Sequence, residues 1–344
     1  MSEKLAPFGD TSIILEHQVQ TILTKQIAHG WLLDTKQCFS LLGELKERKL
    51  EVEHEVRTKF KPLATFVKEV TPKYNKDGNI SVNGLKFLGD DISTVCGVFS
   101  RIEFPEFNLG SRQQIGKYLK FFGWKPVDFT EKGHPIVDEK ALGKVKDIPE
   151  ALLIAEYLTL QKRIAQVQSW VDASDKKDQR VHGYVNTIGA VTGRMTHSSP
   201  NLAQVPSVYS PYGKECRECW TVPKGYKLVG ADAAGLELRM LAHYMNDKEY
   251  TDAILHGDIH TTNQEAAGLT TRDSAKTFIY AFLYGAGDAK IGSIVGGSKR
   301  DGAKLKDVFL ENTPSLRQLR ERVARASVRG HLKGLDQRKL IIRS

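Results

Sequence analysis

Cysteine and long apolar runs are both scarce in this chain, and each scarcity excludes a class of protein. Four cysteines in 344 residues are too few for a small disulfide-stapled domain and indicate a reducing compartment. No run of about 20 apolar residues occurs, so no transmembrane helix is expected. The N-terminus lacks the basic and apolar pattern of a secretory signal. We therefore expect a cytoplasmic protein without a membrane partner.

Internal repeats and low-complexity segments are also absent, whereas positive charge is in excess. The chain has 50 lysines and arginines against 41 acidic residues, a formal net charge of +9 and a sequence pI near 9.2. This balance favours a polyanionic partner such as a nucleic acid. The length suffices for a large core and for more than one domain.

Helical periodicity dominates the first half of the sequence. Helices are predicted from about Leu15 to Ile27, from Asp34 or Thr35 to Phe60, from the capping residue Ser111 to Phe121, and over about 149–171. Turn signals at Asp77-Gly78 and Asn83-Gly84 predict short strands between residues 71 and 107.

The pattern changes after Asp178. Short strands are expected there, including one over Tyr226–Ala231 that leads directly into Asp232. Helices resume at Leu236 and continue to about residue 329. The chain is therefore predicted to be an α+β protein that is mostly helical.

The most informative pattern is a stripe of four side chains at steps of four. Arg272, Lys276, Tyr280 and Tyr284 precede Gly285, and residues four apart lie on one helix face. Thr270 or Thr271 can cap this helix and Gly285 can end it. Two cations followed by two rings suit a polyphosphate joined to a sugar and base. An amphipathic surface helix with core tyrosines is the alternative.

Asp232 follows an apolar run and is a candidate ligand for a hard cation. Magnesium prefers oxygen ligands and takes few protein carboxylates, and phosphoryl transfer uses such ions. The alternative is a turn aspartate that caps the next helix. Glu237 has a similar alternative, as a first-turn glutamate that favours the helix dipole.

Three segments together resemble one known family. The stripe resembles the fingers-helix motif R-x-x-x-K-x-x-x-Y-x-x-x-Y-G of family A DNA polymerases. The segment from Asp232 to Arg239 resembles the motif D-Y-S-x-I-E-L-R, with Ala233 and Ala234 at its second and third positions. The segment from Thr192 to Pro206 resembles the motif T-G-R-x-x-x-x-x-P-N-L-x-x-I-P. The flanking Gly257–Thr261 and Gly285–Asp288 are most similar to the phage replicative branch.

The resemblance implies a right-hand architecture with thumb, palm and fingers. It assigns residues 1–178 to N-terminal helices and a thumb with a small β insertion, and 179–240 to a partial palm. Residues 241–329 would be fingers, and 330–344 would begin a returning palm that is incomplete at the C-terminus. The implied activity is template-directed DNA synthesis from dNTPs on a primer-template, with Mg2+ as cofactor.

The resemblance also implies roles for residues around the nucleotide. Asp232 and the Ala233 carbonyl would bind metal, and Arg272 and Lys276 would bind the triphosphate and stabilise charge on the leaving pyrophosphate. Glu237 would lie beneath the sugar and exclude a 2′-hydroxyl. His260 would contact a phosphate; the alternative is an ordinary polar histidine. Tyr280 would pack against the sugar, and Tyr284 would lie near the templating base.

A second implied set would contact DNA. Arg194, Asn201 and Gln204 would reach base edges in the minor groove, where acceptors occupy similar places in every base pair; a polar turn is the alternative. Contacts to duplex phosphates would come from the thumb residues Arg112, Lys117, Lys162 and Arg163. The pair Cys216 and Cys219 has no accompanying metal pattern and is interpreted as incidental.

One expected element is missing from the sequence. The family takes its second metal carboxylate from a His-Asp-Glu turn, and this chain contains no His-Asp dipeptide. We therefore expect part of a split or truncated polymerase, with a genuine start at Met1 and a complementing fragment that carries the turn. The proofreading exonuclease domain that precedes the thumb in many relatives is also not expected in this sequence. Thioredoxin as a processivity partner is doubtful, because the insertion between Phe60 and Asn108 looks too short.

Two other interpretations remain open at this stage. A non-catalytic remnant could still hold primer-template DNA through its basic thumb. A single-subunit RNA polymerase would share the palm, although Glu237 and the paired tyrosines argue against it. A phage-encoded enzyme would work in the cytoplasm of its bacterial host.

Overall fold

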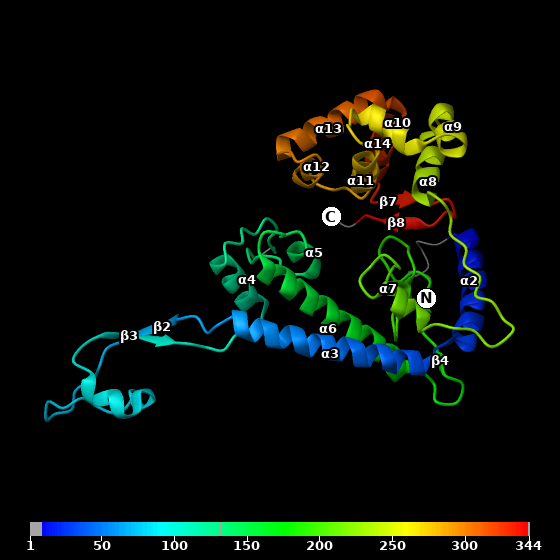
Figure 1. Ribbon diagram of the computed structural model, residues 1–344. Helices are drawn as coiled ribbons and strands as arrows, with labels where there is room; N and C mark the ends of the chain where they lie inside the picture. Colours follow the sequence, from blue (N-terminus) through cyan, green and yellow to red (C-terminus); the bar gives the residue numbers. More distant parts are fainter. Residues whose placement is uncertain (1–8, 131, 343–344) are drawn as a thin grey trace. The chain divides into compact units, whose positions relative to one another are not determined.

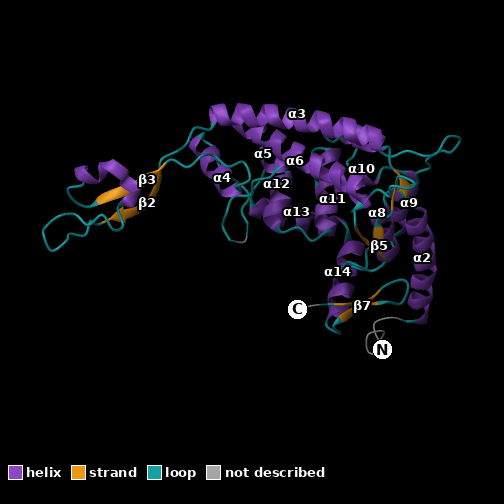
Figure 2. Ribbon diagram, turned by 90° about the horizontal axis from the view of Figure 1, so that it is seen from below, coloured by secondary structure: helices purple, strands orange, loops and turns teal. Residues whose placement is uncertain are grey.

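The computed structural model describes residues 9–130 and 132–342. Helices supply most of this part of the chain, and strands occur in short pairs (Figure 2). The chain divides into two compact units. We call residues 29–184 and 197–225 the long-helix unit, and residues up to 28, 185–196 and 226–344 the short-helix unit.

Two antiparallel helices of 25 residues each are the longest elements of the long-helix unit (Figure 1). They are α3 (Thr35–Lys59) and α6 (Pro149–Ala173), and they pack along one another. The Asp34 carboxylate caps α3 by accepting from the Gln37 N–H at 3.0 Å, and Pro149 opens α6, where a missing N–H costs nothing. Both helices were predicted from the sequence and are confirmed.

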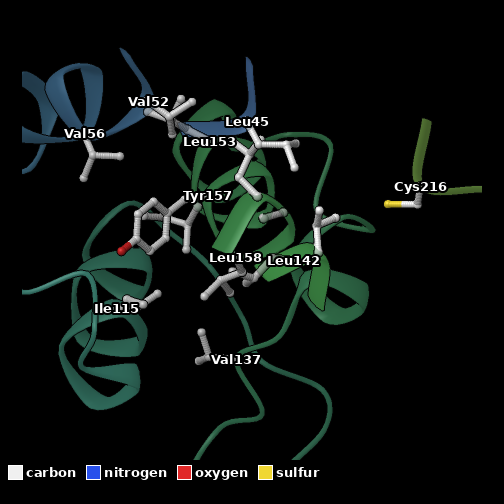
Figure 3. Packing of buried hydrophobic residues seen from close by; sticks show 14 of the residues in the cluster. Leu45, Val52, Val56, Ile115, Val137, Leu142, Leu153, Tyr157, Leu158 and Cys216 are labelled. Carbon is white, nitrogen blue, oxygen red and sulfur yellow. The ribbon is translucent and has the colours of Figure 1, made fainter. Parts of the chain in front are cut away.

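Between them lies an apolar core to which α4 (Arg112–Phe121) and α5 (Glu139–Leu142) contribute. Figure 3 shows side chains from these elements pointing toward one another, including Leu45, Ile115 and Tyr157. The predicted cap of α4 is present, since the Ser111 hydroxyl accepts from the Gln114 N–H at 3.3 Å.

The Cys216-x-x-Cys219 pair belongs to this core. Cys216 lies on α7 (Gly213–Glu218), Cys219 follows it, and both are fully buried. Burial raises the pKa of Cys216 to about 11, so this thiol stays protonated and packs as a small apolar group. Burial in an apolar cluster agrees with the incidental interpretation of the spacing.

The remaining strands of this unit are short. β1 (Trp31–Leu32) pairs with β4 (Arg180–Val181). β2 (Thr65–Val70) pairs antiparallel with β3 (Phe99–Glu103), and the 3₁₀ segment η1 (Lys86–Thr94) lies in the connection. The predicted turns at Gly78 and Gly84 occur in this connection, and both glycines have positive φ. β5 (Tyr184–Asn186) and β6 (Thr196–Ser198) pair where the chain passes between the units.

The short-helix unit contains the second apolar core, which is built around Leu238, Phe278, Ile279 and Phe309. Its first helix is α2 (Asp10–His29), and its last element is the antiparallel hairpin of β7 (His331–Lys333) and β8 (Lys339–Ile341). The helices between them are α8 (Leu236–Met245), α9 (Lys248–His256), α10 (Ile259–Ala267), α11 (Arg272–Leu283), α12 (Asp288–Ile294), α13 (Lys299–Asn312) and α14 (Pro314–Ser327).

The strand predicted over Tyr226–Ala231 is wrong. This segment has no strand assignment, and the Val229 side chain is 86 % exposed. A strand is stabilised by its hydrogen-bonded neighbours. Within the described ranges no other segment pairs with residues 226–231, so β-prone residues alone do not form a strand here.

The predicted boundaries at residues 178, 240 and 329 stay predictions, because the two compact units follow contacts rather than chain order. Among the described helices, none combines the length and apolarity that crossing a bilayer requires.

Candidate functional site

The predicted stripe lies on one outward face of α11. The Thr271 hydroxyl caps the helix by accepting from the Ser274 N–H at 3.2 Å, and Gly285 has a φ of 74° just after its end. The opposite face buries Ala275 and contributes Phe278 and Ile279 to the second core. Burial of the other face leaves Arg272, Lys276 and Tyr284 exposed, with Tyr284 at 64 %. Tyr280 is half-buried and packs against the second core, so the alternative of a core tyrosine holds for Tyr280 and not for Tyr284.

Arg272 already holds an anion, the carboxylate of Asp258. Its Nε lies 2.6 Å from Asp258 Oδ2, and its Nη2 donates to Oδ1 at 3.2 Å. The guanidinium holds the pKa of Asp258 well below its usual range, and the carboxylate raises the pKa of Arg272. Asp258 also caps α10 through the His260 N–H. The pair shows that this end of α11 can bind a two-oxygen anionic group in a fork geometry.

Lys276 lies one turn further along the stripe. It is exposed, and within the described chain its ammonium makes no hydrogen bond or ion pair. The stripe thus offers one cation that is paired and one that is not.

His260 faces the same region from α10. Its ring lies 6.5 Å from the Tyr280 ring, centroid to centroid, and its Nδ1 is buried without a partner among the described atoms. Burial lowers the pKa of His260, and the neighbouring Arg272 lowers the pKa further. The histidine is therefore neutral at pH 7 and offers one N–H donor rather than a third positive charge.

The aromatic end of the stripe meets Glu237. The Tyr284 hydroxyl donates to Glu237 Oε1 at 3.1 Å, and burial raises the pKa of Tyr280, with Glu237 as the second cause. Glu237 lies in the first turn of α8, so its position fits the helix dipole as well as a role beside a sugar.

Asp232 lies in the exposed segment before α8. It does not cap that helix, because Gly235 occupies the N-cap position with a φ of 61° and no side-chain cap is formed. The capping alternative is therefore excluded. Arg239 Nε donates to the Ala234 carbonyl at 2.8 Å, which fixes the turn that follows Asp232 and Ala233.

A cluster of possible cation ligands among the described residues lies in the long-helix unit, away from Asp232 in the sequence. Asp175, Asp178 and His182 bring one ligand atom each within 4.8 Å of one another. Asp232 is not part of such a group within residues 9–130 and 132–342. The long-helix unit therefore holds a polar cluster that sequence reasoning missed, and the Asp-x-x-Asp-x-x-x-His spacing was its only signal.

The predicted minor-groove residues fall on both units. Arg194 is exposed at the end of a turn in the short-helix unit, where the Ala190 N–H donates to its carbonyl at 3.1 Å. Asn201 and Gln204 lie in the long-helix unit at η2 (Leu202–Gln204). The Asn201 side chain accepts from the Ala203 N–H at 3.1 Å, whereas the Gln204 side chain is exposed.

The basic residues predicted to contact duplex phosphates differ in how exposed their charged groups are. Lys162 is exposed and pairs with Glu139 at 2.6 Å. Arg163 was expected on an exposed helix face, but it is 9 % exposed and donates to the Pro211 carbonyl at 3.0 Å. The guanidinium of Arg163 thus serves an interior hydrogen bond and is not available on the exposed face of α6.

Arg112 and Lys117 share a cavity of about 810 Å³ that α4 lines together with Thr130 and residues 134–138. Arg112 donates to the Val137 carbonyl, and Lys117 Nζ donates to Thr65 Oγ1 at 2.9 Å. Lys120 and His134 line the same cavity, so this end of the long-helix unit is cationic.

Three hydrogen bonds that hold these segments in place were not predicted from the sequence. Arg272 donates to the Asp258 carboxylate, and Arg239 donates to the Ala234 carbonyl. Gln166 Nε2 donates to the Gln204 carbonyl at 2.6 Å. Only Asp258 gave a signal, because an aspartate just before a helical run is a typical cap.

Comparisons with known proteins agree with the motifs. The family described as DNA polymerase family A matches residues 88–344. A DNA-directed DNA polymerase of Escherichia phage T7 is 40 % identical over 97 % of this chain and 56 % of its own length. The enzyme of Enterobacteria phage T3 gives the same values. The chain therefore spans about half the length of these relatives.

A solved structure supports the α+β fold. It is titled as the POL domain of Pol1 from M. smegmatis in complex with DNA primer-template and dNTP, and it matches with a TM-score of 0.71. The match covers 94 % of this chain and 52 % of that chain at 18 % identity. The T7 alignment spans 394 positions, more than the 344 residues here, so that relative carries insertions within the matched stretch.

Proposed function

Because the chain belongs to DNA polymerase family A, we propose that it takes part in template-directed DNA synthesis. The reaction transfers a nucleotide from a dNTP to the 3′-hydroxyl of a primer paired to a template. The outward stripe on α11 is the observation that carries this proposal. It presents a guanidinium in fork geometry, an unpaired ammonium and two rings in the order that phosphates, sugar and base require.

In this function the stripe binds and orients the nucleotide. Arg272 exchanges Asp258 for phosphate oxygens, Lys276 adds charge where the pyrophosphate leaves, and neutral His260 donates one hydrogen bond. Tyr280 and Glu237 contact the sugar, and Tyr284 lies at the templating base. These roles are consistent with the contacts that already join Tyr284 to Glu237 and His260 to Tyr280.

The residues present fit part of a magnesium site. Asp232 is exposed and makes no hydrogen bond to the described residues, and the adjacent Ala233 carbonyl can supply a second oxygen. Bound Mg2+ would lower the pKa of the primer hydroxyl and stabilise the leaving group. One carboxylate does not complete a two-ion site, so the second carboxylate would come from a complementing fragment with the His-Asp-Glu turn.

The proposed setting is replication of phage DNA in the cytoplasm of a bacterial host. Arg194, Asn201, Gln204, Lys162 and Arg112 would contact the primer-template, and Arg163 would support them from within. Thioredoxin is not included among the proposed partners, because the insertion between Phe60 and Asn108 is expected to be too short for it. A primer-template-binding remnant without catalysis is the second candidate, and the single carboxylate favours it.

The purified chain should bind primer-template and extend it poorly or not at all, because one carboxylate cannot hold two ions about 3.5–4 Å apart. Primer extension with magnesium, with and without a fragment that carries the His-Asp-Glu turn, measures this. Recovery of synthesis with the fragment supports the split polymerase, and binding without recovery supports the remnant. Vigorous synthesis by the chain alone would refute the expectation.

Binding of the chain to duplex DNA should be independent of sequence and should weaken steeply with salt. Phosphate contacts release counterions, and each one adds about 0.9 to the slope of log affinity against log salt. Fluorescence anisotropy with two unrelated primer-templates at several salt concentrations measures both properties. A flat salt dependence or a strong preference for one duplex would contradict the DNA-binding assignment.

A further inference from the structure

The turn that carries Arg194 faces the C-terminal hairpin. A Cβ placed on Gly193 would lie 3.7 Å from Arg338 Nη1 and 3.9 Å from Leu340 Cδ2. Gly193 and Arg338 both line a hollow of about 340 Å³ between the turn and β8, together with Ile188 and Val191. Arg338 therefore lies close to the turn and is placed to support it.

Arg338 is itself held by two carboxylates. Its Nη2 forms an ion pair with Glu16 of α2 and lies 3.1 Å from Asp336 Oδ2. The Arg338 and Glu16 side chains are only 12 % and 20 % exposed. An ion pair shielded from water is sensitive to removal of one partner, because the other charge is left without compensation.

Apart from the ion pair of Glu16 with Arg338, few residues anchor the N-terminal helix α2. Of its residues α2 buries only Ser12 and Leu23, and Gly9 lies against Gln337 of the hairpin turn. Figure 1 shows the hairpin beside one end of α2. Glu16 thus joins the two ends of the short-helix unit at the point where the hairpin meets the turn of residues 187–194.

We propose that Glu16 is a positioning residue for primer-template binding: by holding Arg338 it fixes the turn that presents Arg194. Loops place functional side chains well only when a rigid element supports them. The match to the family model begins at residue 88 and does not include Glu16. The inference rests on the proposed function, because it assigns Arg194 to DNA.

The test compares the full chain with Glu16→Gln, which removes the charge and keeps the shape. Anisotropy with a labelled primer-template should show about tenfold weaker binding, within the range of indirect coupling. The exposed Glu311→Gln on α13 is the matched control and should bind normally. The charge-reversed pair Glu16→Arg with Arg338→Glu should bind better than either single reversal.

An Arg194→Ala background separates positioning from general damage. If Glu16 acts through Arg194, Glu16→Gln should cost almost nothing further in that background. An undiminished loss there, or no loss in the wild-type background, would overturn the proposal.

Hydrogen exchange gives a readout that does not need DNA. The amides of residues 188–194 should exchange faster in Glu16→Gln, while those of α11 should not change. If the unaltered chain fails to bind primer-template, the proposed function fails, and the exchange result still decides whether Glu16 fixes the turn. Unchanged exchange in residues 188–194 would overturn the positioning role.

Discussion

When the chain is supplied with a fragment that carries the His-Asp-Glu turn, replacing Asp232 by alanine should lower magnesium-dependent primer extension by at least about 10³-fold. Asp232 is exposed, caps no helix and makes no hydrogen bond to the described residues. Its carboxylate is therefore available to a cation, and the substitution would remove the proposed metal ligand without disturbing packing. Primer-template affinity should stay within about twofold, since phosphate contacts come from other residues.

The measurement pairs single-turnover incorporation with primer-template anisotropy. Asp252→Ala, an exposed aspartate on α9, is the matched control and should retain both. An Asp232→Ala protein that still extends the primer would remove Asp232 from the metal site. Equal losses in incorporation and binding would instead indicate a structural role.

Replacing Lys276 by alanine should slow incorporation by about 10²–10³-fold and leave primer-template affinity largely unchanged. The ammonium lies one turn from Arg272 and one from Tyr280, and it has no hydrogen-bond or ion-pair partner among residues 9–130 and 132–342. Charge moves toward the leaving pyrophosphate as the bond breaks, so a cation there stabilises the transition state more than the bound substrate. An exposed lysine on a helix contributes little stability, and its truncation should fold normally.

Lys290→Ala on α12 provides the control, because Lys290 is also exposed and helical. Its incorporation rate should match that of the unaltered protein. Equal rates for Lys276→Ala and the unaltered protein, or a loss confined to duplex binding, would show that α11 does not bind the triphosphate.

The helices could be predicted because their signals are local. Asp34, Ser111 and Thr271 each cap the helix that the sequence assigned to them, and a cap needs only the next three residues. The strand at Tyr226–Ala231 could not be judged in this way. A strand requires a partner, and the residues of the segment carry no information on whether one is present.

The same distinction applies to the site. Periodicity predicted that Arg272, Lys276 and the two tyrosines share a face, since that follows from helix geometry alone. The contact between Tyr284 and Glu237 joins residues 47 positions apart, and no periodicity reports it. Arg163 is the converse case, because a charged residue on a helix gives no sign of whether its head is turned toward solvent or toward a neighbouring carbonyl.

The pair of Arg272 and Asp258 has a consequence for nucleotide affinity. A free arginine side chain loses rotamer freedom when it binds a phosphate, and that loss weakens binding. Here a carboxylate already immobilises the guanidinium, so much of the ordering occurs on folding. Both side chains are about half exposed, and an ion pair open to water is weak and readily exchanged. In the proposed function, Asp258 therefore orders the Arg272 guanidinium before a phosphate binds, and a multiply charged ligand would displace this carboxylate.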